Sequence, residues 1–172
     1  MPETLPANLP LVNGRDTAPA FWMYNSLWLL LIEGSQTGGS YSLLEQWMRK
    51  DTVVLPHVHN FNDEWFYVIE GTLDLTIGGD AVHGKPGDNI WIPRGTVHEF
   101  TVTSDVCHVL NGYTPGGVEQ SIKHLAQPTD VRELPPTSLP LPDERTMRLI
   151  FNNYWTCEAG AGWEQTNADP RT

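Results

Sequence analysis

Hydrophobic residues between residue 21 and about residue 113 come in short runs that Gly, Pro, Asp and Asn interrupt. The runs are FWMYNSLWLLLIEG, YSLLEQWM, TVVLPHVH, EWFYVIEG, TLDLTI, NIWIP and HEFTVT. Runs of strand length with turn residues between them are typical of an antiparallel sandwich or barrel. The pattern therefore predicts an all-β fold for this part of the chain.

The segment LDLTIGGDAVHG gives the clearest local signal. Residues 73–77 alternate between apolar and polar side chains, as a strand with one buried face does. Gly78 and Gly79 follow directly, and a two-residue hairpin turn needs the positive φ that glycine adopts freely. We expect a tight β-hairpin around these two glycines.

The segments before and after the strand-rich region of residues 21–113 have a different composition. Residues 1–20 contain several prolines and little periodicity, which indicates an arm that can lie over a neighbouring subunit. We assign residues 21–115 to the β-barrel. Residues 116–172 form a predicted C-terminal helical and proline-rich extension that packs on the barrel, so the chain is expected to be one domain.

Three features are expected within the C-terminal extension. Residues 116–128 place apolar side chains on one face of a short helix that ends at Pro128. The prolines of residues 128–142 favour a stiff, extended crossing. Asp143 is positioned to cap a second helix, and Trp155 and Trp163 indicate that part of the remaining tail docks.

Composition and charge narrow the function classes. The 172 residues carry 21 acidic and 10 basic side chains, a formal net charge of −11. Such a charge repels nucleic-acid phosphates and anionic lipids, so we expect no nucleic acid and no membrane partner. The apolar stretch at 26–34 is too short to span a bilayer. Cys107 and Cys157 are too few for a disulfide scaffold, and we expect a cytoplasmic, reducing location with their pairing left open.

Four residues with metal-binding side chains are expected to converge. His57 and His59 lie two positions apart, so a strand projects both from one face. The polar turn NFND lets the chain reverse and brings Glu64 to the same place. His98 follows another turn, at PRG, and opens a further predicted strand. Three imidazoles and one carboxylate suit one divalent transition metal ion, for which Fe, Mn, Co, Ni and Cu all remain open.

These residues resemble the first sequence motif of the cupin superfamily. That motif has a leading glycine, a His-x-His pair, a glutamate and a closing glycine. The sequence matches it at His57, His59, Glu64 and Gly71, but Asp51 stands in place of the leading glycine. The departure concerns a turn and removes no ligand.

The second cupin motif is also matched in part. Gly87, Pro93, Gly95 and His98 occupy its positions, while Val102 stands in place of a final asparagine. Together the motifs resemble those of a single cupin (jelly-roll) β-barrel, here with short C-terminal helices. The resemblance implies that His57, His59, Glu64 and His98 bind the metal, and that the protein is a homodimer.

The chain outside the motifs resembles quercetinase-type bacterial monocupins. Flavonol dioxygenases of that group carry two phenylalanines that Phe66 and Phe100 match. Strand alternation places Phe66 on the face of Glu64 and Phe100 on the face of His98, so both are expected beside the metal. The resemblance implies a small aromatic or phenolic substrate, cleavage with O2, and Glu64 as a catalytic base whose burial raises its proton affinity.

Other interpretations stay open at this point. Phe66 and Phe100 can simply fill the barrel core. Trp65, Tyr67 and Ile69 alternate to the opposite face, where they are expected to pack against the second sheet or a partner subunit. The fold also suits a metal-dependent cupin enzyme acting on a non-flavonol substrate, or a non-enzymatic small-molecule-binding cupin. We expect no ligand role for His83, His108 and His124, and no catalytic role for Cys107 or Cys157.

Overall fold

The computed structural model describes residues 10–137, 139 and 156–157. The described elements are β1 (Ala20–Met23), β2 (Ser26–Ile32), a 3-10 helix (Gly34–Thr37), β3 (Ser42–Arg49), β4 (Val53–Val58), β5 (Asp63–Glu70), β6 (Leu73–Ile77), β7 (Asp80–Gly84), β8 (Asn89–Ile92), β9 (His98–Val102), β10 (Val106–Thr114), α1 (Glu119–Leu125), β11 (Gln127–Thr129) and β12 (Thr156–Cys157).

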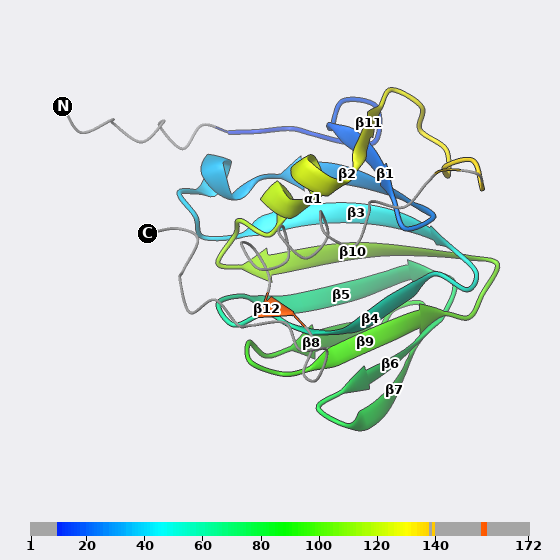
Figure 1. Ribbon diagram of the computed structural model, residues 1–172. Coiled ribbons are helices and arrows are strands. Elements are labelled where there is room, and N and C mark those ends of the chain that lie inside the picture. Colours follow the sequence, from blue (N-terminus) through cyan, green and yellow to red (C-terminus); the bar gives the residue numbers. More distant parts are fainter. Residues whose placement is uncertain (1–9, 138, 140–155, 158–172) are drawn as a thin grey trace.

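The strands form two antiparallel sheets that face each other (Figure 1). The larger sheet has the order β11-β1-β2-β3-β10-β5-β8, and the smaller has the order β12-β4-β9-β6-β7. From β3 to β10 the chain passes repeatedly from one sheet to the other, which is the arrangement of a jelly roll. The predicted all-β fold is confirmed, with α1 as its one described α-helix.

The main core lies between the two sheets. On β5, alternation sends Phe66 and Val68 inward, where they are at most 1% exposed. Tyr67 and Ile69 point outward and are 42% and 40% exposed. The expectation that this outward set packs against the second sheet is therefore wrong, because the other face of β5 makes that contact. Packing against a partner subunit stays a prediction.

Backbone geometry agrees with the expected turns. The hairpin between β6 and β7 is confirmed, with φ of 60° at Gly78 and 96° at Gly79. Asp51, which replaces a motif glycine, has φ of 61°, a conformation that aspartate tolerates better than most residues. The Asp51 amide donates a hydrogen bond to the carbonyl of Val102 at 3.0 Å. The two departures from the cupin motifs thus lie together, and the Val102 amide in turn donates to the carbonyl of Thr52 at 3.0 Å.

The helix α1 is confirmed, but it ends before Pro128. Ala126 already has extended backbone angles, and residues 127–129 pair with β1 as the edge strand β11. Proline is accepted on an edge strand because its missing N–H faces no ladder partner. Ile122 and Leu125 are buried against Phe21 and other residues of the core. The predicted second helix after Asp143 and the docking of Trp155 and Trp163 lie outside the described residues.

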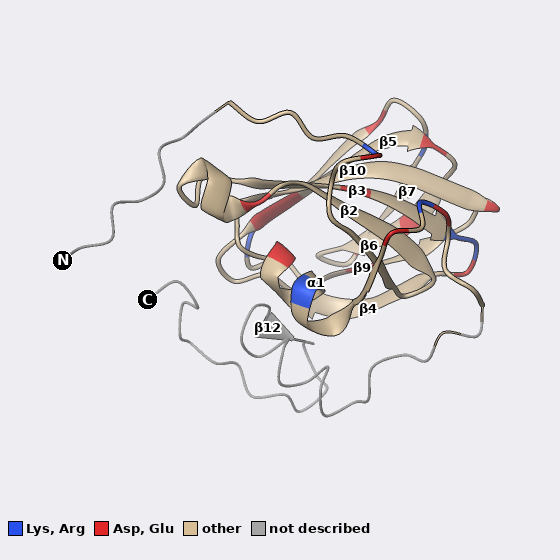
Figure 2. Ribbon diagram, turned by 90° about the horizontal axis from the view of Figure 1, so that it is seen from above, with Lys and Arg blue, Asp and Glu red and all other residues tan. Residues whose placement is uncertain are grey.

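The described part of the N-terminal arm contacts its own chain. Ala18 and Ala20 are buried, and Arg15 donates a hydrogen bond to the carbonyl of Arg132 at 2.8 Å and lies over the Trp47 ring. Figure 2 shows the acidic residues spread over several strands and loops. Within the described ranges, no helix has the length and apolar character needed to cross a bilayer.

Candidate metal centre

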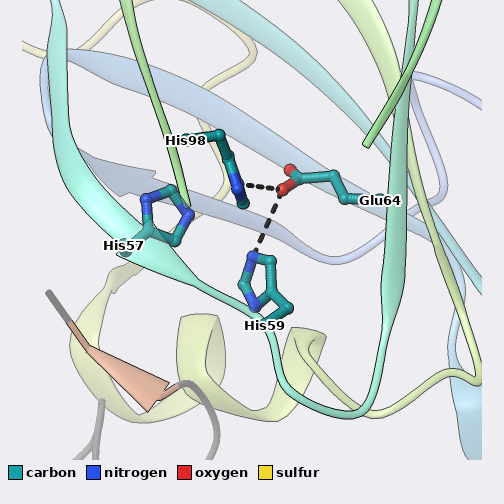
Figure 3. A group of neighbouring side chains, drawn as sticks. All are labelled: His57, His59, Glu64 and His98. Carbon is teal, nitrogen blue, oxygen red and sulfur yellow. Dashed lines mark hydrogen bonds and ion pairs between the residues drawn. The ribbon is translucent and has the colours of Figure 1, made fainter. Parts of the chain in front are cut away.

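The four predicted ligand residues meet inside the fold (Figure 3). One nitrogen or oxygen atom from each of His57, His59, Glu64 and His98 lies within 4.8 Å of those of the other three, and all four residues are buried. His57 lies on β4 and His98 lies opposite it on β9, with ring centroids 4.1 Å apart. The cluster therefore sits between the sheets at one end of these strands.

Hydrogen bonds of the turn at residues 93–95 hold the two motifs together. The Gly95 amide donates to the carbonyl of His59 at 2.8 Å. The Arg94 side chain donates to both carboxylate oxygens of Asp63, at 2.9 and 3.1 Å. Because these contacts tie the turn before β9 to the loop after β4 and to the first residue of β5, they bring His98 to the other ligands.

Two of the imidazoles have a defined orientation. Nδ1 of His57 lies 2.9 Å from the carbonyl of Leu55, and Nδ1 of His98 lies 2.9 Å from the carbonyl of Thr96. A carbonyl only accepts, so each Nδ1 carries the hydrogen. This leaves Nε2 of each ring as the ligand atom, which is how metal-binding histidines are commonly fixed.

Glu64 makes different contacts through its two oxygens. Oε2 lies 2.9 Å from Nε2 of His98 and 3.2 Å from Nε2 of His59. Oε1 accepts hydrogen bonds from Asn111 Nδ2 at 2.9 Å and from the Tyr113 hydroxyl at 2.8 Å. The carboxylate is thus held from behind through Oε1, while Oε2 faces the imidazoles.

The expected rise in the proton affinity of Glu64 is wrong for this arrangement. Burial by itself raises the pKa of the Glu64 carboxyl, but hydrogen bonds and charge from His59 and His98 outweigh burial. The pKa therefore lies well below its ordinary value. Donors on Oε1 act in the same direction because they stabilise the charged form.

The histidines differ in their tendency to take up a proton. Burial, followed by the charges of His98 and His59, holds the pKa of His57 well below its ordinary value. Burial also lowers the pKa of His59. Burial lowers the pKa of His98 as well, but its closer contact with Glu64 prevails, so the net pKa is raised.

The donor set fits a divalent metal ion. With Nδ1 protonated, Nε2 of His98 can face the Glu64 carboxylate favourably only if a proton or a metal cation lies between them. Neutral imidazole nitrogens and a carboxylate oxygen are ligands that first-row transition metals accept. His57, His59, Glu64 and His98 can therefore hold such an ion, although the set alone does not select the metal.

Phe66 and Phe100 lie where strand alternation placed them. Both are buried, and their rings are 5.6 Å apart in an edge-to-face arrangement. They line a cavity of about 20 Å³ together with His57 and Glu64. The other residues that line it are Tyr24, Trp28, Gln46, Val54, Asn111 and Tyr113.

Gln46, Asn111 and Tyr113 were missed by the sequence analysis. A signal was available, because Gln46 occupies an inward position of β3 between Leu44 and Met48. Asn111 likewise interrupts the inward series of Val109 and Tyr113 on β10. A polar side chain at an apolar position of an alternating strand indicates a functional or network role.

The remaining histidines and the buried cysteine stand apart from this cluster. His83 contacts Asp74 on the exposed hairpin, and His108 contacts Glu45 while stacking on Trp47. Neither belongs to the metal-ligand group found among the described residues, nor does His124. Burial raises the pKa of the Cys107 thiol to about 11, which makes it a poor nucleophile.

The two-sheet jelly roll and its buried three-histidine, one-glutamate cluster define a cupin-type metal site. Residues 46–111, which include all four candidate ligands, match the family described as "Cupin domain". This match over part of the chain, together with the fold, supports a place in the cupin superfamily.

A curated relative from Bacillus subtilis has an assigned activity. The chain is 26% identical over 92 residues to its quercetin 2,3-dioxygenase, a match that covers 54% of this chain and 27% of that protein. The curated relatives matched by this chain are covered over only 26% to 53% of their own lengths.

Two solved structures show the same fold. A predicted oxalate decarboxylase from Thermotoga maritima superposes with a TM-score of 0.56 at 16% identity, over 62% of this chain and 99% of that one. A nucleoside dehydratase from Streptomyces superposes with a TM-score of 0.55 at 13% identity, over 65% of this chain and 88% of that one. At such identities the likeness concerns the fold, and these folds carry different chemistries.

Proposed function

We propose that the protein is a metal-dependent dioxygenase of the quercetinase type, which binds a flavonol or similar phenolic or enolic substrate and cleaves it with O2. The observation that carries the proposal is the buried group of three histidines and Glu64 beside the aromatic pair Phe66 and Phe100. The partial similarity to quercetin 2,3-dioxygenase supports the same activity. In this proposal His57, His59, Glu64 and His98 bind one divalent transition metal ion.

The bound metal ion would supply positive charge that favours the deprotonated form of an acidic substrate hydroxyl. Glu64 Oε2 faces the centre of the cluster, and as a carboxylate oxygen it can accept the proton of that hydroxyl. Asn111 and Tyr113 hold Oε1 during this transfer. Glu64 is thereby assigned two roles, as a metal ligand and as the catalytic base.

The aromatic pair orients the substrate in this proposal. Phe66 and Phe100 line the cavity beside Glu64 and lie edge to face with each other. Such a wall favours a flat aromatic ring over an aliphatic chain of similar size. The ligand residues themselves are at most 7% exposed, so the cluster is shielded from bulk water.

The size of the cavity favours a second candidate function. Its volume of about 20 Å³ has room for about one water molecule, whereas pockets for drug-sized ligands measure about 300–1,000 Å³. A flavonol requires side chains such as Tyr24 or Phe100 to move aside. A metal-dependent cupin enzyme acting on a smaller, non-flavonol phenol or enol needs less rearrangement, so this is the alternative.

The test is to mix the metal-loaded protein with quercetin in air and follow the long-wavelength absorbance band of quercetin. Catalytic bleaching with oxygen consumption supports the dioxygenase. A static spectral shift indicates binding without turnover, and no change contradicts a flavonol substrate. A parallel oxygen-electrode screen of small phenols and enols tests the alternative, with His57→Ala as the control protein.

A further inference from the structure

A chain of hydrogen bonds links Gln46 on β3 to the proposed metal centre through Asn111 on β10. Gln46 Nε2 donates to Asn111 Oδ1 at 2.8 Å, and Asn111 Nδ2 donates to Glu64 Oε1 at 2.9 Å. Gln46 and Asn111 are at most 1% exposed. The three side chains also line the same cavity.

The contacts of Asn111 fix the orientation of both amides. Asn111 Nδ2 also lies 3.2 Å from the backbone carbonyl of Trp65. A carbonyl can only accept, so the –NH2 group of Asn111 must face Trp65, and its Oδ1 must face Gln46. Gln46 therefore has to present its own –NH2 group to Asn111. A flipped Gln46 would place two oxygens against each other.

This orientation leaves the other end of the Gln46 amide without a partner. Gln46 Oε1 is buried and accepts no hydrogen bond from any of the described residues. Buried carbonyl oxygens are nearly always hydrogen-bonded, and an exception calls for an explanation. Because the Gln46 side chain lines the cavity beside Glu64 and Phe66, a molecule in that cavity is the natural source of the missing donor.

We infer that Gln46 Oε1 selects ligands that carry a second O–H or N–H donor, beyond the group that reaches the metal centre. The inference rests on the proposed function, because it places the substrate in the cavity next to Glu64. It narrows the substrate class to rings or enols with at least two polar hydrogens, such as dihydroxylated aromatics. An aromatic compound with one hydroxyl group would leave Gln46 Oε1 unpaired.

The test uses the full chain loaded with Co²⁺ and small probes of known hydroxyl position. Catechol, resorcinol and hydroquinone are each compared with their monomethyl ethers, and binding is followed through the visible absorbance of cobalt. In the wild-type protein at least one diol should bind about threefold to tenfold more tightly than its ether, the range for one net hydrogen bond. Gln46→Met, which keeps the side-chain length but has no such oxygen, should reduce that preference to less than about twofold.

A matched control separates hydrogen bonding from steric exclusion of the methyl group. Val54→Ala enlarges the same cavity and leaves Gln46 unchanged, so it should retain the preference for the diol. The inference would be overturned if the preference for the diol over its ether were lost in Val54→Ala but kept in Gln46→Met. It would also be overturned if the wild-type protein bound each diol and its ether equally well. Circular dichroism and cobalt stoichiometry check that the variants are folded, and Gln46→Leu replaces Gln46→Met if the latter is not.

The result can be separated from that of the proposed function. If quercetin is not consumed but diol binding depends on Gln46, the flavonol activity fails and the selection by Gln46 stands. If quercetin is bleached catalytically while Gln46→Met discriminates between the probes as the wild type does, only the inference about Gln46 fails.

Discussion

His57 and His98 lie directly opposite each other on the paired strands β4 and β9, and their ring centroids are 4.1 Å apart. Each ring is fixed by a carbonyl at Nδ1, and burial, followed by the charge of His98, lowers the pKa of His57. Two imidazoles so close together cannot both be protonated without repulsion. Binding of one metal ion by the two neutral rings avoids this repulsion. The predictions below on metal content and on pH depend on this arrangement of His57 and His98.

Replacement of His57, His59 or His98 with Ala should empty or strongly weaken the metal site. Each change removes one of four ligands, and the buried arrangement supplies no substitute among the described residues. Metal content measured by mass spectrometry on purified variants checks this outcome. His83→Ala, which alters an exposed histidine of the β6–β7 hairpin, is the control and should retain full occupancy. Full occupancy in all three ligand variants would refute the assignment.

Acidification should release the metal reversibly. Ligand imidazoles must be neutral to bind, so protons compete with the metal. Burial lowers the pKa of His98, but the stronger effect of Glu64 makes its net pKa higher than usual, whereas the pKa of His57 lies well below its usual value. As the pH falls, His98 is therefore the first of the two to be protonated. Equilibrium dialysis between about pH 5 and pH 8 should show occupancy falling with pH, and constant occupancy would contradict imidazole ligation.

Glu64→Gln should keep much of the bound metal while slowing turnover by about 100-fold or more, the usual contribution of a general base. The three imidazoles can still bind the metal, but the amide, unlike the carboxylate, cannot take the proton of a substrate. Metal analysis and steady-state rates on the best substrate of the phenol screen measure the two effects separately. An unimpaired rate would show that Glu64 is not the base.

Phe66→Ala should raise KM for bulky aromatic substrates and leave metal content unchanged. The ring is 1% exposed and contacts Phe100, so its removal also costs roughly 3–5 kcal/mol of folding free energy. The thermal stability of the variant should therefore be measured alongside its kinetics. If stability falls but KM does not change, Phe66 serves only the core.

Cys107 should resist alkylation in the folded protein. Its side chain is buried and its thiol pKa is raised to about 11, so little thiolate exists at pH 8. In a Cys157→Ser background Cys107 is the only cysteine. Iodoacetamide should modify it rapidly in denaturant and slowly without denaturant, as followed by intact mass. Equal rates in both conditions would contradict the burial.

The sequence allowed the β fold and the ligand cluster to be predicted for different reasons. The fold follows from alternation on strands such as β5 and β6, which is a local property. The convergence of His98 with His57 depends on pairing between β4 and β9, and it was expected from the turn at residues 93–95 together with the resemblance of the motifs. Predicting that Phe66 is buried beside Glu64 required both the local alternation of the strand and the resemblance of the motifs.

Other features could not be read from the chain because they arise from contacts distant in sequence. The low pKa of Glu64 depends on imidazoles from β9 and the loop after β4, while burial alone suggested the opposite sign. The strand β11 forms because the edge of β1 is available to residues 127–129. The link from Gln46 to Asn111 joins two positions 65 residues apart.

The bonds of the turn at residues 93–95 are made entirely by protein atoms. The Gly95 amide donates to the carbonyl of His59, and the Arg94 side chain donates to the Asp63 carboxylate. The ligands are therefore preorganised, and capture of an ion costs little further loss of chain entropy. A centre built in this way can give up one metal and accept another without unfolding, so the ion found in the purified protein would reflect cellular supply as much as the preference of the four side chains.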